Sequence, residues 1–193
     1  MLINVRAIKA AGIVASTEAT RYYLNGVCLE FGPHGVIAIA TDGHRMVMAR
    51  ASEAGAEPMK PRQIIMPSAA VKQIKIGRGT DLGELTETAE GWLLTHGGQM
   101  IAFKPVDGTF PEWRRVLPAR PEEGAKPAHF QPKYVGDMGR VAEALGLPQS
   151  AAVIHHNGQD PAWVTFGETE EAIGVIMPFQ TGATLARPSW LEG

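Results

Sequence analysis

The sequence predicts an α+β fold in which helices cover one face of antiparallel sheets. The main observation is an order of strand, helix and three strands that repeats three times along the 193 residues, at about 60 residues per unit. The helices are predicted from apolar residues at helical spacing and from residues that favour helix starts. The strands are predicted from the alternation of apolar and polar residues between turn signals.

The first unit starts with a short strand and a helix from Val5 to about Ser16, in which Ile8 and Ile13 share the apolar face. Two alternating stretches follow, YYLNGVCLEF and VIAIATDGHRMVMARA. The second stretch is interrupted by Asp42-Gly43, a pair typical of a two-residue type I′ hairpin turn. The first unit therefore supplies one helix and three strands after its opening strand.

The second unit opens with a strand from Arg62 to Met66. Pro67-Ser68 then begins a helix over SAAVKQIK, because both residue types favour the first turn. Three strands follow over DLGELTET, EGWLLTHG and QMIAFKPV. After the segment GTFPEWRRVLP comes ARPEEGAKP, whose Pro, Glu and Gly content indicates a linker.

The third unit opens at Ala128 with AHFQ in the position of the first strand. Its helix is predicted from Pro132 to Leu145, since proline favours a helix start and Gly146 a helix end. The strands that follow are SAAVIHHNG, PAWVTFGE and EAIGVIMPF.

Charge is distributed unevenly over these elements. The chain has a net charge of −2, so its overall charge does not indicate a nucleic-acid binder. Basic residues nevertheless gather on the three helices, whereas acidic residues gather on the strands. Two interpretations are open: an ordinary solvent-exposed face, or a helical surface that faces phosphates without reading bases.

The sequence offers little support for catalysis or metal binding. HExxH, CxxC, GxSxG and phosphate-loop motifs are all missing, and we predict no catalytic residue, metal ligand or cofactor. Cys28 lies in an apolar strand pattern and is predicted to be a core residue. A single cysteine fits a reducing cytoplasm, and the sequence contains neither a membrane-length apolar run nor a signal peptide pattern.

Four segments together resemble the bacterial sliding clamp, the β subunit of DNA polymerase III. They are RYYLNG (21–26), ATDGHRM (40–46), FPEWRRVLP (110–118) and VIMPF (175–179). The resemblance implies the DNA-clamp fold, with residues 1–118 as the clamp's middle domain and residues 128–180 as half of its third domain. Residues 119–127 are then a linker and residues 181–193 a C-terminal tail. The clamp's first domain and the other half of its third have no counterpart, and Gln180 replaces a basic residue often found there.

The resemblance also implies a ring around double-stranded DNA, lined by helices and bound without sequence preference. The basic positions expected to face DNA are Arg6, Lys9, Arg21, Lys72, Lys75, Arg78, Lys133 and Arg140.

A further implication is a pocket on the outer face that binds a short peptide from a polymerase or repair protein. The positions that match this pocket are Leu24, Thr41, Gly43, His44, Arg45, Met46, Pro111, Arg115, Val116, Val175, Met177, Pro178 and Phe179. Apolar side chains and a few polar groups of this kind suit a peptide groove.

The leading expectation is a non-enzymatic processivity factor for DNA replication or repair. Because three units are present, we expect a homo-dimer that completes the third unit, or a tetramer that closes a ring. The alternative is a peptide-binding module, a decoy or an adaptor, that engages clamp-binding motifs without encircling DNA. Neither function involves a membrane.

Overall fold

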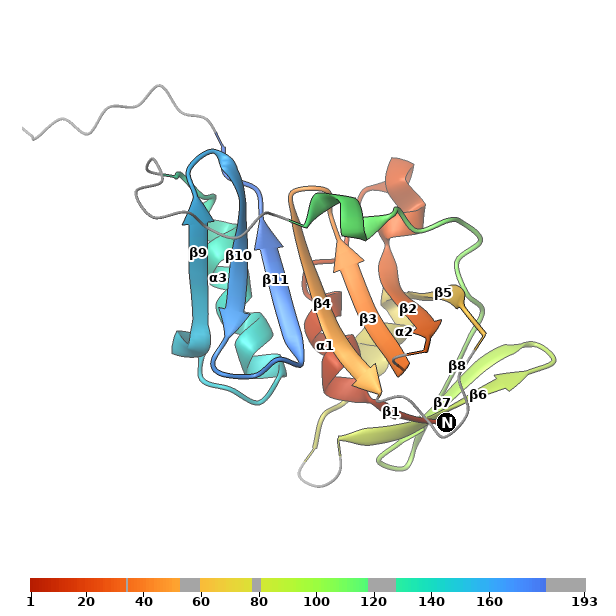
Figure 1. The fold of residues 1–193 in the computed structure, drawn as a ribbon. Coiled ribbons are helices and arrows are strands. Elements are labelled where there is room, and N and C mark those ends of the chain that lie inside the picture. The colour runs from red at the N-terminus through yellow and green to blue at the C-terminus, as the bar shows by residue number, and fades with distance from the viewer. Residues whose placement is uncertain (34, 53–59, 78–80, 118–127, 180–193) are drawn as a thin grey trace, which may run out of the picture.

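The computed structural model describes residues 1–33, 35–52, 60–77, 81–117 and 128–179. Two antiparallel sheets form the scaffold, and the helices α1, α2 and α3 lie behind the larger sheet (Figure 1). The larger sheet has the strand order β5-β2-β3-β4-β11-β10-β9, and the smaller has the order β1-β6-β7-β8. The predicted α+β class with helices on one face of antiparallel sheets is confirmed.

The first unit follows the predicted order, with shifts at two boundaries. Its elements are β1 (Leu2–Asn4), α1 (Val5–Gly12), η1 (Ala19–Leu24), β2 (Gly26–Gly32), β3 (Gly35–Thr41) and β4 (Arg45–Ser52). Helix α1 ends at Gly12, before the predicted Ser16, because Ser16 donates its backbone N–H to the carbonyl of Leu24 instead. Residues 22–24, predicted as strand, form the end of a 3-10 helix that Asn25 closes on the Tyr22 carbonyl.

The second unit exchanges strands with the first. It comprises β5 (Arg62–Pro67), α2 (Ser68–Gln73), β6 (Leu82–Thr88), β7 (Gly91–His96) and β8 (Gln99–Phe103). Strand β1 pairs with β6 in the smaller sheet, and β5 pairs with β2 in the larger one. The close pairing of β5 requires a glycine at position 26, where an added Cβ would lie 2.4 Å from the Met66 carbonyl oxygen.

The third unit departs from the predicted pattern. It contains α3 (Pro132–Ala144), η3 (Gln149–Ala151), β9 (Ala152–Asn157), β10 (Asp160–Phe166) and β11 (Ala172–Ile176). The expected first strand at AHFQ (128–131) does not form. In the other units this strand needs a neighbouring unit to pair with, and the described residues contain no such neighbour for the third unit. The domain boundaries at 118, 128 and 180 border undescribed residues and stay a prediction, as do the linker and the tail.

Strands β4 and β11 join the third unit to the first. Their antiparallel register runs from Ala172 opposite Ala49 to Ile176 opposite Arg45. The sheet is buried on both faces: Val27 and Leu29 belong to the core beneath the helices, whereas Cys28 belongs to a second core on the outer face. That outer core is covered by the segment that carries η2 (Trp113–Val116), as Figure 1 shows in green.

A buried ion pair reinforces this junction. Arg45 is only 6% exposed, and its guanidinium pairs with Asp42 in its own hairpin and with Asp137 on α3. It also lies 4.6 Å from the ring centroid of Tyr134, in cation–π geometry. Burial alone would raise the pKa of the Asp137 carboxyl, but hydrogen bonds from Arg45 and Arg140 outweigh it and hold the pKa below its usual value.

We expect Asp137→Asn to lower the free energy of unfolding by about 3 kcal/mol, because it leaves the buried Arg45 without a full countercharge from α3. Urea denaturation measures the change. Arg140→Ala is the matched control: it removes a pair to the same carboxylate, but Arg140 is 63% exposed, so the loss should stay below about 1 kcal/mol. Equal losses in the two variants would contradict a dominant role for the buried pair.

The Asp137 carboxyl should also make stability depend on pH. Since its folded pKa is lowered, its stabilising contribution is complete above the ordinary aspartate pKa of about 3.9 and is lost as the pH falls through the folded value. The difference in unfolding free energy between the wild type and Asp137→Asn should therefore shrink below pH ~4. A difference that stayed constant down to acid unfolding would show that this carboxylate is not the source.

Candidate functional site

A groove of about 310 Å³ lies where η1, the β3–β4 connection, η2 and the end of β11 meet. This volume is at the lower end of the range typical of ligand sites, roughly 300–1,000 Å³. The predicted pocket residues that line it are Leu24, Thr41, Gly43, Arg45, Met46, Pro111, Val116, Val175 and Met177. The structure thus brings together residues from positions 24 to 177 that the sequence matched only by motif.

The β3–β4 connection forms the first wall and is held by its own side chains. The Asp42 Oδ1 accepts the backbone N–H groups of His44 (2.9 Å) and Arg45 (3.1 Å), and the Thr41 hydroxyl donates to the Arg45 carbonyl (2.7 Å). The predicted type I′ turn at Asp42-Gly43 is wrong, because that turn needs two residues with positive φ and only Gly43 has one, 92°. Thr41 lies opposite Met46, and the Asp42 backbone N–H donates to the Arg45 carbonyl (3.4 Å), so residues 42–45 form the turn.

The segment containing η2 forms the second wall, and Glu30 of β2 anchors it. The Glu30 carboxylate accepts hydrogen bonds from the Trp113 indole (3.1 Å) and the Gln63 amide (2.7 Å), and it pairs with Arg114. Burial raises the pKa of Glu30, but these three donors outweigh burial and lower it. Arg114 also lies 4.1 Å from the Trp113 ring centroid. The wall is therefore fixed to the sheet by a charged network.

The end of β11 forms the third wall and comes from the third unit. The Met177 backbone N–H donates to the His44 carbonyl (2.8 Å), which continues the β4–β11 pairing past the end of the strands. Val175 is buried, whereas the Met177 side chain is 41% exposed. The groove therefore exists only where the first and third units meet.

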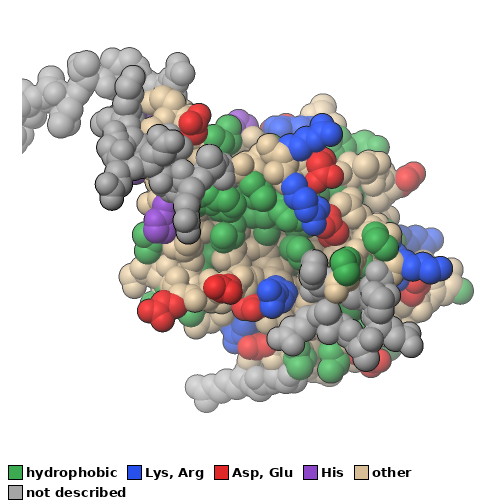
Figure 2. Space-filling view, viewed as in Figure 1, with side chains coloured by type: hydrophobic (Ala, Val, Ile, Leu, Met, Phe, Trp, Pro, Cys, Tyr) green, Lys and Arg blue, Asp and Glu red, His purple; other side chains and the backbone are tan. Residues whose placement is uncertain are grey.

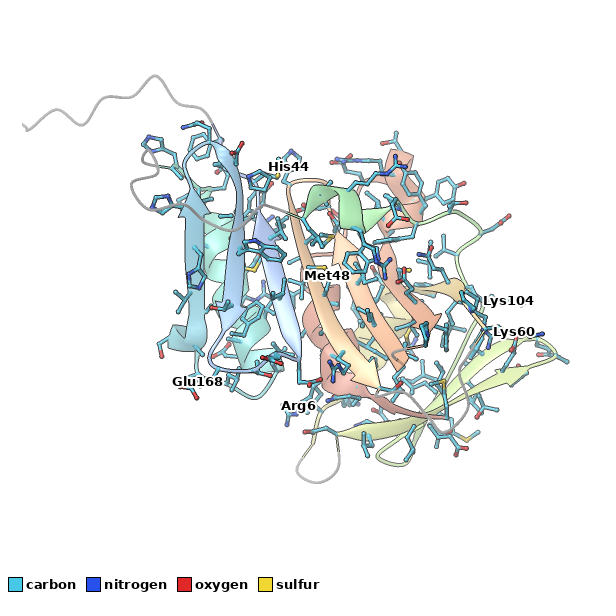
Figure 3. All side chains as sticks on the ribbon, viewed as in Figure 1. Arg6, His44, Met48, Lys60, Lys104 and Glu168 are labelled. Carbon is cyan, nitrogen blue, oxygen red and sulfur yellow. The ribbon has the colours of Figure 1, made fainter. Side chains whose placement is uncertain are left out.

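Four predicted pocket residues do not line this groove: His44, Arg115, Pro178 and Phe179. The His44 ring stands at the end of the β3–β4 hairpin (Figure 3) and lies 6.1 Å from the ring of Tyr134. Phe179 instead contacts His129, with ring centroids 6.3 Å apart. Arg45 does line the groove, but Asp42 and Asp137 already neutralise its charge.

Sequence reasoning missed some lining residues. They are Tyr23, Phe110, Glu112 and Trp113. All lie within the motifs RYYLNG and FPEWRRVLP, so those motifs already contained the signal. Arg21, predicted to face DNA, also lines the groove: it pairs with Glu18 at 2.6 Å, and a Cβ on Gly43 would lie 2.5 Å from its guanidinium. Arg21 is better assigned to the groove than to the helical face.

The outer face around the groove is apolar. Figure 2 shows hydrophobic side chains gathered over β4 and β11, with charged side chains around them. A second hollow of about 270 Å³ lies on this face between Met48, Trp163 and Ile173, and it shares Trp113 with the groove. Figure 3 marks Met48 near the middle of this region.

Some of the predicted DNA-facing residues lie together on the opposite side of the sheet, between the helices. A broad hollow of about 1,050 Å³ between the helices is lined by Arg6, Lys9, Lys72 and Arg140. Lys75 and Lys133 do not line it, and Arg78 lies outside the described residues.

The cations of this hollow differ in their partners. Arg6 pairs with Asp81 (2.8 Å), Arg140 pairs with Asp137 (2.8 Å), and the Lys9 ammonium donates to the Ile74 carbonyl. Lys72 has no ion-pair partner among the described residues. Within this part of the chain, no group of three or more His, Cys, Asp or Glu side chains is placed to hold a metal ion. The described helices are all too short or too polar to cross a membrane.

Comparison with known proteins agrees with this geometry. Residues 4–112 match the family described as DNA polymerase III beta subunit, central domain. The chain is 32% identical to the beta sliding clamp of Escherichia coli K12 over 122 residues and 34% identical to that of Vibrio cholerae over 124 residues. These alignments cover 61% and 60% of this chain but only 32% and 33% of the relatives, so it spans about a third of their length.

Solved structures show the same fold over a longer stretch. A sliding clamp from Bacillus subtilis superimposes with a TM-score of 0.74 and 17% identity, covering 94% of this chain and 64% of that one. A DNA polymerase III beta subunit from Pseudomonas aeruginosa gives 0.67 and 19%, covering 94% and 66%. Since the family match extends over more than half of its residues, this chain belongs to the DNA polymerase III beta subunit, or sliding-clamp, family.

Proposed function

We propose that this chain is a clamp-like processivity factor that holds a peptide of a DNA polymerase or repair protein in the groove. It encircles double-stranded DNA as a homo-oligomer, acts in the cytoplasm and catalyses no reaction of its own. The observation that supports the proposal most strongly is that the groove keeps all three of its walls, although the chain spans only a third of its curated relatives.

The chemistry of the groove suits a short peptide with a leucine or phenylalanine anchor. Leu24, Met46 and Val175 supply a buried apolar floor, and the exposed Val116 and Met177 stand at its rim. Binding energy in such sites concentrates in one or two buried anchor side chains. Polar groups are few and mostly engaged, so the peptide is recognised mainly by shape and apolar contact.

In this proposal, the helical side of the larger sheet contacts DNA. The four cations that line the hollow between the helices can face phosphates, and three of them already have partners within the chain. The Arg6–Asp81 pair is partly exposed, and in this proposal the Arg6 guanidinium exchanges its carboxylate for a phosphate contact. Binding outside a closed ring should therefore be weak and sensitive to salt.

The same observation favours a second candidate function, a peptide-binding module that does not encircle DNA. Lys72 alone among these four cations has no carboxylate or carbonyl partner within the described residues, and a decoy or adaptor would need the groove and no more. The two candidates share peptide binding and differ in DNA binding.

We expect a fluorescent peptide carrying a clamp-binding motif to bind with a dissociation constant below about 50 µM. Met177→Ala should weaken binding about tenfold, because it removes an apolar rim contact. Met100→Ala is the matched control, since Met100 is 71% exposed on β8 of the other sheet. Fluorescence anisotropy measures both. Absent wild-type binding, or equal losses in the two variants, would remove the peptide groove from both candidate functions.

For DNA, we expect Lys72→Glu combined with Lys75→Glu to reduce retention on circular duplex and to lower the salt slope of binding by about 2. Lys60→Glu with Lys104→Glu makes the same charge change at the side of the molecule beside β5 and β8 (Figure 3). Pull-down of nicked circular DNA over a salt series separates the outcomes. Retention lost only in the helical variant supports the clamp, whereas wild-type retention equal to background supports the module.

A further inference from the structure

The two complete units cover each other's sheet edges in the same register. In each unit, the strand that precedes the helix pairs with the first strand of the other unit's three-stranded meander. Asn4, just before α1, lies opposite Leu82, the first residue of β6. Pro67, just before α2, lies opposite Gly26, the first residue of β2. The residue before the helix therefore meets the start of the partner meander in both cases.

The third unit contains the two segments that such an exchange needs, a first meander strand (β9) and a segment before its helix (residues 128–131), but neither is paired in this way within the described part of the chain. Strand β9 stands at the end of the larger sheet and, among the residues that the structure describes, is paired with β10 alone. Residues 128–131 directly precede α3 and lie in no strand. An open edge of this kind offers a row of backbone donors and acceptors to an incoming strand.

Apolar side chains are exposed around this edge. Val153 on β9 is 47% exposed, and Val135 on α3 is 40% exposed. An added Cβ at Gly136 of α3 would meet no atom within 4 Å, whereas at Gly12 of α1 it would lie 2.7 Å from Val71 of α2. The helices of the complete pair thus pack closely, and this part of α3 has no such neighbour within the described chain.

The chain cannot close this edge with its own residues 128–131. Gln131 caps the start of the 13-residue helix α3, which is about 20 Å long, and β9 begins only after the chain has left the other end of that helix. The His129 carbonyl accepts a bond from the Phe179 N–H (2.9 Å), and in an extended segment the neighbouring residues direct their backbone groups to the other side. Within the described residues, no strand pairs with that other side, where a second chain can pair.

We infer that a second copy of this chain completes the third unit by mutual strand exchange. Residues 128–131 of each copy pair antiparallel with β9 of the other, and the two contacts are related by a twofold axis. Directly opposite residues of an antiparallel pair share a face. Phe130 and Ile154 both pack against the core beneath the helices, as the opposed residues Met66 and Val27 do in the first sheet, so Phe130 lies opposite Ile154 and Gln131 opposite Val153. The partly buried Phe130 then extends this core over Ile154. This dimer does not depend on peptide or DNA binding.

Disulfide trapping tests the contact and its register. Gln131→Cys combined with Val153→Cys should give a covalent dimer under mild oxidation, because directly opposite residues point to the same face. An intrachain bond is excluded, since Cα atoms more than about 7 Å apart cannot be bridged. Burial raises the pKa of the native Cys28 thiol to about 12, so it stays protonated and inaccessible. Gln131→Cys with Ala152→Cys, shifted by one residue, is the control. Monomer alone, or equal trapping in the control, overturns the inference.

Light scattering at micromolar concentration tests the same dimer without a cross-link. The wild type should have twice the 20.7 kDa mass of one chain, or an even multiple of it. Val153→Glu should halve the smallest assembly and keep peptide binding. Val116→Glu, at a valine of similar exposure in the groove, should keep the assembly and lose the peptide. A wild-type mass of a single chain, or an unchanged mass in Val153→Glu, overturns the inference and leaves the peptide groove intact.

Discussion

The pairing of β4 with β11, locked by the buried contact between Arg45 and Asp137, is the constraint on which the rest of the molecule depends. It turns two separate sheets into one seven-stranded sheet and sets the end of β11 beside the β3–β4 connection. A buried ion pair of this kind contributes little net stability but is costly to break, so it favours one arrangement over others. The groove is the functional consequence of that arrangement, because its walls come from both sides of the junction.

The same sheet separates two chemistries. On its outer face, an apolar core and the Glu30 network hold the second wall of the groove in place. On its inner face, the helices present the basic residues around a wide hollow. A protein with a net charge of −2 can carry both, because α1, α2 and α3 bear five cations and only two carboxylates, and neighbouring carboxylates balance Arg6 and Arg140 locally.

The sequence was sufficient to predict the repeat, the fold class and most of the groove. The motifs RYYLNG and FPEWRRVLP both contain residues that line the groove, but a motif does not say which of its side chains points there: Leu24 and Val116 line the groove, whereas Arg115 does not. His44 stands beside Gly43, but its ring lies near that of Tyr134, while its backbone N–H donates to the Asp42 carboxylate in the turn. Arg45 turns to a partner 92 residues away, and no local pattern predicts such a contact.

Local sequence patterns also could not predict the exchange of strands between the first and second units. Alternation predicts that β1 and β5 are strands, but not that each joins the sheet of the other unit. AHFQ shows the limit most clearly: its position in the repeat suggests a strand, but a strand forms only where another edge can receive it. The missing strand is thus explained by a missing neighbour and not by an unsuitable sequence.

Hydrogen–deuterium exchange with and without a clamp-motif peptide tests most directly whether the groove spans the β4–β11 junction. Backbone amides at Gly43–Met46 in the first unit and at Val175–Met177 in the third should exchange more slowly together when the peptide binds. Protection of one segment without the other, or of neither at a saturating peptide concentration, would contradict a groove formed by both units.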